Sequence, residues 1–292
     1  MNVKEALKLA QQKLKDKNIS SAELDAEVLL VRSFSSKNIN RAWLYSNLNK
    51  ELSKTTYNKY ICLIKRREKY EPIAYITGYK EFYGLDFCVN KNVLIPRPET
   101  ELLVKEALKE ILKTHKLKTK TYTITEIGTG SGCIIVALAT KFKVQSSKIK
   151  MYSTDVSQKA IDIAKINAKK NKVSKQIYFL QGNLFTPLPG KVDLIIANLP
   201  YISKNEMKKL PPDIKNFEPK IALYGGPDGL NYYRKLLKHV DNYLAPCGKI
   251  FLEIGYKQAS LLKRLIKQNL PESKIKIIKD YAYHNRIIKI ET

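Results

Sequence analysis

Apolar residues in the first 75 positions recur every three or four residues, the spacing that places side chains on one face of an α-helix. The first amphipathic stretch carries Val3, Leu7, Leu9 and Leu14. Ser20 and Glu23 have the spacing of a capping box, which predicts that Ser20 begins a helix over residues 24–34. A third helix is expected over residues 53–70, because a proline soon afterwards disfavours helical backbone. The pattern predicts a small helical domain over residues 1–75.

The pattern changes over residues 76–98. Aromatic and aliphatic residues alternate with polar ones around Gly84, which predicts a β-hairpin that turns near this glycine. The segment over residues 94–98 contains two prolines, which fix their own φ and restrict their neighbours. We therefore expect a hairpin linker over residues 76–98, followed by a helix over residues 99–112.

From residue 122 onwards, β-rich runs alternate with helical ones. Strands are predicted at residues 122–127, 149–154, 177–180, 192–197 and 249–254, with helices at 134–142, 158–170, 230–244 and 258–268. This alternation indicates an α/β domain over residues 99–292, with a parallel sheet that binds ligands at the carboxyl ends of its strands. Two final β segments, 275–278 and 286–290, have no helix between them, which predicts an antiparallel hairpin at the sheet edge.

A glycine-rich loop follows the first strand of this domain. It reads Gly128-Thr129-Gly130-Ser131-Gly132. Glycines allow a tight turn and close approach to a ligand, and the N-terminus of the next helix favours an anionic group. A dinucleotide fingerprint would need a glycine where this chain has Cys133. The loop instead suits a small carboxylate, such as the methionine end of S-adenosylmethionine; a purely structural turn is the alternative.

Polar residues also follow the next two predicted strands. Asp155 ends the second strand, where a carboxylate can accept hydrogen bonds from both hydroxyls of a ribose. It could equally be the N-cap of the following helix, but the glycine loop one strand earlier favours the cofactor interpretation. Asn183 and Leu184 follow the third strand, where an amide can bind adenine and an apolar side chain can pack on its face. For these two residues an ordinary loop is an equal alternative.

The most specific motif, Asn198-Leu199-Pro200-Tyr201, ends the fourth strand. An amide or exocyclic amine is a poor nucleophile because its lone pair is delocalised. The Asn198 side-chain oxygen and the Leu199 carbonyl are placed to accept its two N–H groups, and Tyr201 can stack on the planar group. This would be catalysis by positioning and preorganisation rather than by a general base. A turn built from Asn and Pro is the structural alternative.

Composition adds one open question. The chain has 292 residues, of which 44% are hydrophobic and 27% charged, as in ordinary globular proteins. Its net charge is +26, from 53 basic and 27 acidic residues. This charge predicts proximity to RNA or the ribosome, or else reflects a lysine-rich composition, since only eight of the basic residues are Arg. The sequence leaves both interpretations open.

Other features are expected to be absent. No apolar run reaches the roughly 20 residues that span a bilayer, and the first residues lack a signal-peptide layout, so we expect no membrane contact and a cytoplasmic protein. The cysteines are widely separated and have no neighbouring His cluster, so we predict neither a disulfide framework nor a metal site. They are Cys62, Cys88, Cys133 and Cys247.

Together these motifs make the chain similar to the HemK family of peptide chain release factor glutamine N5-methyltransferases. The family-specific stretches are Pro96-Arg97-Pro98-Glu99-Thr100-Glu101 and Phe217-Glu218-Pro219, with further likeness in Gly225-Gly226-Pro227-Asp228-Gly229-Leu230 and Leu252-Glu253-Ile254-Gly255. The resemblance implies a Rossmann-like class I methyltransferase domain that uses S-adenosylmethionine, preceded by a helical domain that helps dock the release factor. It implies the glutamine of the Gly-Gly-Gln loop as substrate.

The chain departs from the family in two places. Leu199 stands where the family usually has proline; leucine keeps the backbone carbonyl but gains an N–H. The family often carries an acidic and an aromatic residue at Asn183 and Leu184, which leaves the adenine contacts open.

Two alternative functions remain. Asn-Leu-Pro-Tyr also occurs in ribosomal RNA adenine N6-dimethyltransferases, so an RNA or DNA adenine N6-methyltransferase is the main one. Those enzymes place the accessory domain after the catalytic one, whereas here it comes first. The other is a catalytically silent ribosome-binding module, which the glycine loop, Asp155 and Asn198 argue against.

Overall fold

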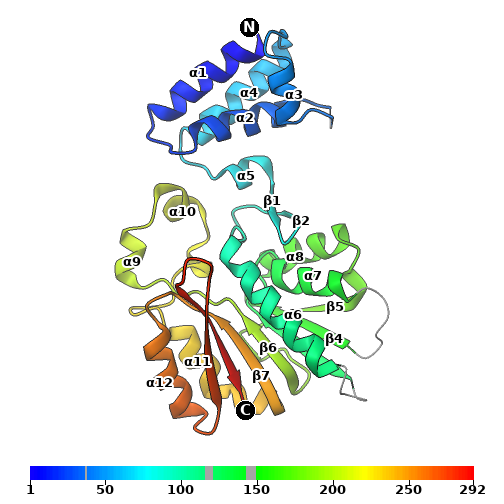
Figure 1. The fold of residues 1–292 in the computed structure, drawn as a ribbon, viewed down its shortest axis with the longest axis vertical. Coiled ribbons are helices and arrows are strands. Elements are labelled where there is room, and N and C mark those ends of the chain that lie inside the picture. Colours follow the sequence, from blue (N-terminus) through cyan, green and yellow to red (C-terminus); the bar gives the residue numbers. More distant parts are fainter. Residues whose placement is uncertain (37, 116–120, 143–148) are drawn as a thin grey trace. The chain divides into compact units, whose positions relative to one another are not determined.

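The computed structural model describes residues 1–36, 38–115, 121–142 and 149–292, and Figure 1 shows their arrangement. Contacts divide the chain into two compact units. The first contains Met1–Tyr79 and Pro211–Phe217, and the second contains Lys80–Leu210 and Glu218–Thr292. Each unit has its own hydrophobic core and is described by itself.

The first unit is helical. Its elements are α1 (Val3–Lys15), α2 (Ala22–Ser33), α3 (Arg41–Ser46), α4 (Lys54–Arg67), α5 (Ile73–Thr77) and α10 (Pro212–Phe217). The apolar faces of α1, α2 and α4 pack together around Leu14, Leu29 and Ile64, which are fully buried. Leu9, predicted on the same face as Leu14, is exposed instead. The core therefore forms from the residues that keep helical spacing.

The start of α2 corrects one prediction. The expected capping box between Ser20 and Glu23 does not form, because α2 begins one residue later, after Ser21. The Ser21 hydroxyl donates to Asp25 Oδ2 (2.8 Å), while exposed Glu23 accepts from Lys15 Nζ (2.7 Å). A capping box does occur at α1, where Asn2 and Glu5 exchange hydrogen bonds between their side chains and backbone amides.

The second unit is built on a seven-stranded sheet. Its strands are β3 (Tyr122–Ile127), β4 (Ile149–Asp155), β5 (Ile177–Gln181), β6 (Val192–Ala197), β7 (Leu244–Glu253), β8 (Lys274–Lys279) and β9 (Asn285–Glu291). They lie in the order β5-β4-β3-β6-β7-β9-β8, in which β3 to β7 pair in parallel and β9 is antiparallel to both of its neighbours. The predicted α/β sheet and its antiparallel edge hairpin are confirmed.

Helices cover both faces of this sheet (Figure 1). One face packs against α6 (Glu101–His115), α7 (Cys133–Lys141) and α8 (Gln158–Lys170), and the other against α11 (Asn231–Tyr243) and α12 (Ala259–Asn269). Successive residues of a strand point to opposite faces, so in β6 Leu194 and Ile196 enter the first core while Ile195 enters the second. Burial on both sides explains why the central strands are almost entirely apolar.

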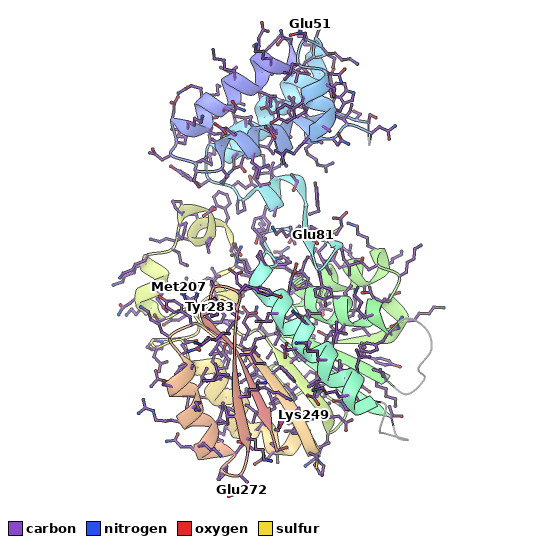
Figure 2. All side chains as sticks on the ribbon, in the orientation of Figure 1. Glu51, Glu81, Met207, Lys249, Glu272 and Tyr283 are labelled. Atoms are coloured by element: carbon purple, nitrogen blue, oxygen red, sulfur yellow. The ribbon has the colours of Figure 1, made fainter. Side chains whose placement is uncertain are left out.

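Shorter elements complete the second unit. They are β1 (Tyr79–Phe82), β2 (Leu85–Cys88), η1 (Pro98–Thr100), η2 (Ser174–Gln176), α9 (Lys204–Lys208) and η3 (Lys220–Ala222). The predicted hairpin of β1 and β2 turns at Gly84, whose φ of 74° favours glycine. Lys249, labelled in Figure 2, and Lys289 both bind the Glu110 carboxylate and so link α6 to β7 and β9. No described helix combines the length and apolar character needed to cross a membrane.

One ion pair is buried inside the helical unit. Arg67 Nε in α4 lies 2.7 Å from Asp25 Oδ2 in α2, and the two side chains are only 8% and 6% exposed. Arg67 also donates to the Glu71 carbonyl (3.1 Å). A charge buried this deeply is tolerated only when it is paired, so each of the two residues depends on the other.

We expect Arg67→Met to lower the free energy of unfolding of the helical unit by about 3 kcal/mol, because it leaves the Asp25 carboxylate buried and without its cation. The only tryptophan of the chain, Trp43, lies in this unit and packs edge-on against Phe34, so its fluorescence during urea unfolding reports on this unit. Lys15→Met breaks an exposed pair and should leave the transition unchanged. Equal effects of the two variants would contradict the prediction.

Candidate active site

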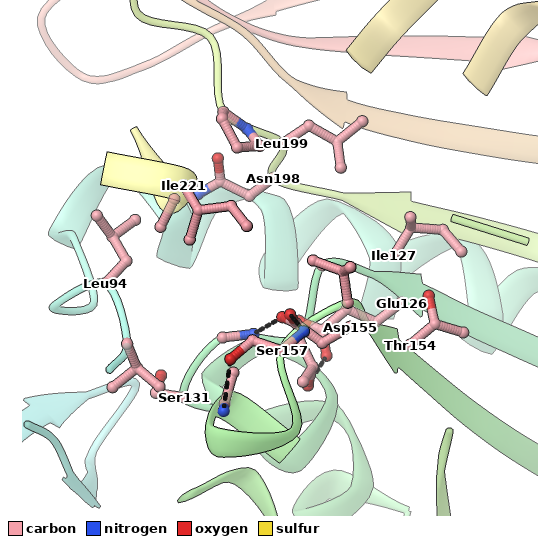
Figure 3. Close-up of a pocket in the computed structure, with 18 of the residues that line it drawn as sticks. Leu94, Glu126, Ile127, Ser131, Thr154, Asp155, Ser157, Asn198, Leu199 and Ile221 are labelled. Atoms are coloured by element: carbon pink, nitrogen blue, oxygen red, sulfur yellow. Dashed lines mark hydrogen bonds between the residues drawn. The ribbon is translucent and has the colours of Figure 1, made fainter. Parts of the chain in front are cut away.

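A cavity opens at the carboxyl ends of β3, β4 and β6 (Figure 3). Most of the residues that the sequence suggested as binding residues line it: Gly128, Thr129, Gly130, Ser131, Asp155, Asn183, Leu184, Asn198, Leu199 and Pro200. Gly132 and Tyr201 are not among its lining residues. The fold thus brings residues of all four predicted motifs together, and only the last residue of the glycine loop and of the Asn198 motif is missing from the lining.

The glycine loop differs in function along its length. Gly130 has a φ of +52°, and a Cβ built on it would have no atom within 4 Å, so its backbone is open to close approach. Gly132 has a φ of +79°, and a Cβ there would lie 3.0 Å from the Cβ of Ala164. Gly132 is therefore required for packing α7 against α8, and its contact to a cofactor stays a prediction.

The buried side-chain amide of Asn167 hydrogen-bonds the glycine loop from α8. Asn167 in α8 is fully buried and donates to the Ser131 carbonyl (2.8 Å). The same side chain donates to the Cys88 carbonyl (2.9 Å) and accepts from the Cys88 N–H (2.6 Å). One side chain thus ties the glycine loop to the end of the β1–β2 hairpin.

The Asp155 carboxylate, at the end of β4, hydrogen-bonds the backbone of the glycine loop. Its Oδ2 accepts from the Gly130 N–H and its Oδ1 from the Ser157 N–H, both at 2.9 Å. Burial raises the pKa of Asp155, and these backbone hydrogen bonds act in the opposite direction. The alternative that Asp155 caps α8 is wrong, because Ser157 is the N-cap and accepts from the Ala160 N–H. The Asp155 carboxylate therefore faces the cavity with its orientation already fixed (Figure 3).

Glu126 is a cavity residue that the sequence interpretation did not single out. It is 1% exposed, and its Oε2 accepts from Ser153 Oγ (2.7 Å) and Thr129 Oγ1 (3.0 Å). Its Oε1 is buried and has no hydrogen-bond partner within the described ranges. Burial raises the pKa of Glu126 to about 8. The sequence did contain a signal for this residue, because Glu126 is an acidic residue in the otherwise apolar end of β3.

Asn198 directly follows β6, and its side chain is anchored at one end. Asn198 Nδ2 donates to Thr100 Oγ1 in η1 at 3.2 Å. Leu199 is 3% exposed and packs against the loop, with its Cδ2 3.5 Å from where a Gly128 Cβ would stand. Within the described part of the chain, no residue donates a hydrogen bond to the Leu199 carbonyl or accepts one from the Leu199 N–H.

Tyr201 packs against the segment that follows β7. Its carbonyl accepts from Gln258 Nε2 (2.9 Å), and its ring lies against Gly255, where a Cβ would be 3.5 Å from Tyr201 Cδ2. Burial is the main cause that raises the pKa of the Tyr201 hydroxyl, and the negative charge of the nearby Glu253 carboxylate raises it further. The stacking role expected for Tyr201 stays a prediction.

Two of the motifs that define the resemblance support the site from outside. A Cβ on Gly225 would lie 2.4 Å from the Pro200 carbonyl oxygen, so only glycine allows this loop to pack against the segment after β6. Glu218 accepts from the Ile95 N–H (3.3 Å) and pairs with Arg97, which holds the proline-rich segment beside the cavity. These residues build the walls rather than the reacting surface.

Leu184 is held in an unusual backbone conformation. It has a φ of +50°, which is uncommon for a residue with a side chain, and its carbonyl accepts from Thr154 Oγ1 (2.8 Å). Asn183 and Leu184 line the cavity together with Gly182. They are placed where the sequence interpretation expected contacts to an adenine.

Comparison with known proteins adds two family matches and several full-length relatives. The PrmC N-terminal domain family matches residues 5–78, and a methyltransferase domain family matches residues 118–279. A release factor glutamine methyltransferase of Rhodopirellula baltica is 37% identical and covers 94% of this chain and 91% of the relative. One of Bacillus cereus is 34% identical and covers 100% of this chain and 99% of the relative.

A bifunctional methyltransferase of Rickettsia typhi is 38% identical over 99% of this chain. This match covers 57% of the Rickettsia protein, so the chain spans little more than half the length of that relative.

The raised pKa of Glu126 predicts how stability depends on pH. Between its ordinary value of 4.5 and about 8, the folded protein keeps a proton that the unfolded chain has lost, so this group makes stability fall as pH rises. We expect Glu126→Gln to reduce that fall, measured as the free energy of urea unfolding from pH 5 to pH 8. Exposed Glu272→Gln should keep the wild-type dependence. Identical pH dependence in wild type and Glu126→Gln would contradict the prediction.

Proposed function

This chain belongs to the release factor glutamine methyltransferase family, and from that membership we propose that it methylates the side-chain nitrogen, N5, of a release-factor glutamine. We propose that the glutamine is that of the Gly-Gly-Gln motif and that the methyl donor is S-adenosylmethionine. The family matches also confirm the fold expected from the sequence, a helical domain followed by a Rossmann-like methyltransferase domain. The observation that carries the proposal is the anchored amide of Asn198, in the same cavity as the glycine loop.

The residues of the cavity fit S-adenosylmethionine, which supplies the methyl group when bound. The open backbone at Gly130 suits close approach of the methionine end, and the oriented Asp155 carboxylate suits a pair of ribose hydroxyls. Asn183 and Leu184 are proposed to contact the adenine. Thr129 and Ser131 complete the proposed binding loop.

We propose that the chain's contribution to the reaction is positioning. An amide nitrogen is weakly nucleophilic, and two acceptors placed on its N–H groups hold its lone pair toward the methyl donor. Asn198 Oδ1 is the free end of an anchored amide, and the Leu199 carbonyl has no donor among the described residues. Pro200 restricts the backbone after them. We propose that Tyr201 stacks on the planar amide, an assignment that rests on the motif Asn198-Leu199-Pro200-Tyr201.

The remaining parts of the proposal concern the partner. We propose that the helical domain, residues 1–75, helps hold the release factor, with residues 76–98 as linker and residues 99–292 as catalytic domain. Support comes from the separate family match over residues 5–78. We propose that the protein acts in the cytoplasm, and its net charge of +26 supports proximity to ribosomes and their RNA.

The cofactor assignment predicts a loss of binding in Asp155→Ala. Removing the carboxylate leaves the ribose hydroxyls and the Gly130 N–H without an acceptor, which should weaken S-adenosylhomocysteine binding by about 1–3 kcal/mol in calorimetry. Asp162→Ala, on the exposed side of α8, should bind as wild type does. Binding of NAD in place of S-adenosylhomocysteine would refute the assignment.

The nucleophile's position predicts that Asn198→Ala lowers turnover on purified release factor by about 10²–10³-fold, and much more than it changes substrate affinity. Leu199→Pro is the matched control. It keeps the carbonyl and removes an N–H that no described residue accepts, so its activity should be close to wild type. Rates are measured by transfer of a labelled methyl group.

Mass spectrometry of the product separates the proposed function from the main alternative. One methyl group on the release-factor glutamine supports the proposal, and a Gln-to-Ala release factor should stay unmodified. Dimethylated adenine in ribosomal RNA beside an unmodified release factor would establish the adenine methyltransferase instead.

A further inference from the structure

The proposed reaction requires one orientation of the Asn198 amide. Only an oxygen facing the substrate can accept its N–H, whereas an inverted amide would present a second donor. The two ends of an asparagine amide have nearly the same shape, so their hydrogen-bond partners decide which end faces the cavity. In the structure the nitrogen end is bound, by donating to Thr100 Oγ1 at 3.2 Å.

Thr100 does not fix this direction by itself. A hydroxyl both donates and accepts, so Thr100 could receive a hydrogen bond from Asn198 Nδ2 or give one to Asn198 Oδ1. Its side chain is 2% exposed, which leaves little access to water. The direction therefore depends on whether the hydroxyl proton of Thr100 has another acceptor.

A carboxylate that can take this proton, that of Glu253, lies at the end of β7. Its side chain is 1% exposed, and its carboxylate interacts with the hydroxyls of Thr100 and Tyr201. Its Oε2 has no hydrogen-bond partner in the described residues, so it retains the capacity to accept. An ionised carboxylate can only accept, so it draws the Thr100 proton to itself and leaves the Thr100 oxygen as the acceptor for Asn198.

We propose that Thr100 and Glu253 are positioning residues that set which end of the Asn198 amide faces the substrate. The order of donation runs from Asn198 Nδ2 to Thr100 and from Thr100 to the Glu253 carboxylate, which leaves Asn198 Oδ1 toward the glutamine amide. This rests on the proposed function, because only a substrate that donates N–H groups requires that orientation. Neither residue touches the reacting atoms.

The direction of donation depends on the charge of Glu253. Burial raises its pKa to about 7, and a protonated Glu253 could donate to Thr100 and reverse the chain. Several titratable or charged groups interact electrostatically with the Glu253 carboxylate. They are Glu99, Cys133, Tyr201, Tyr233 and Arg286. The active form is the ionised one, so kcat should fall as pH decreases through about 7.

The test compares variants of the full chain on purified release factor. Thr100→Val keeps the shape and removes the hydroxyl, and we expect kcat to fall by about 10- to 100-fold with little change in KM for the release factor. Its remaining rate should lose the pH step near 7. Thr100→Ser keeps the hydroxyl and should restore most of kcat. Glu253→Gln can donate to Thr100 through its amide and should resemble Thr100→Val.

Thr125→Val is the matched control for removing a buried hydroxyl. Thr125 lies in β3, is fully buried, and its Oγ1 has no hydrogen-bond partner in the described part of the chain. It should leave kcat unchanged. Calorimetry with S-adenosylhomocysteine and thermal melting accompany every variant. Unchanged cofactor affinity in Thr100→Val shows that the loss lies in positioning the nucleophile and not in folding.

The outcomes separate this inference from the function on which it rests. Wild-type kcat in Thr100→Val, or a loss that Thr100→Ser does not restore, overturns the positioning role while the proposed function stands. Wild-type protein that leaves release factor unmethylated overturns both. If Thr100→Val does not fold, Glu253→Gln decides, and a wild-type kcat and pH profile in that variant overturn the inference.

Discussion

The parallel pairing of β3 with β6 is the constraint on which the site depends. Its register places Ile127 opposite Ala197, so the next residues along each strand, Gly128 and Asn198, leave the sheet side by side. The glycine loop and the proposed nucleophile cradle are 70 positions apart in sequence, and this register alone brings them into contact. It is also where the chain order of the strands reverses, the position at which open α/β sheets bind their ligands.

The carboxyl edge of the sheet gathers acidic groups in a strongly basic protein. Asp155 and Glu253 end β4 and β7, and Glu126 is the last residue but one of β3; burial is the largest influence on the pKa of each, raising it. Keeping such groups inside costs folding free energy, which the surrounding apolar cores must offset. Hydroxyl and backbone groups hydrogen-bond the carboxylates of Glu126 and Asp155 and so orient both before any ligand binds.

Much of the fold could be predicted because its signals are local. Periodicity located α8 and β6 at their observed bounds, since a buried strand and an amphipathic helix are each defined by a short pattern. The capping box at Ser20 failed because α2 begins after Ser21, whose hydroxyl donates to Asp25, while Glu23 accepts from Lys15 of the preceding helix. Partners far apart in sequence leave no local pattern, so the sequence could suggest Asn198 but not its hydrogen bond to Thr100, 98 positions earlier.

The position of β9 has a consequence for synthesis of the chain. β9 follows β8 in sequence but lies between β7 and β8, hydrogen-bonded to both. A nascent chain that has emerged only as far as β8 therefore leaves the backbone N–H and C=O groups along one edge of β7 unpaired, and β8 without its place in the sheet. Unpaired edges of this kind are prone to wrong pairing. The second unit thus reaches its final arrangement only after residues 285–291 have left the ribosome, although every residue that lines the cavity has emerged well before them.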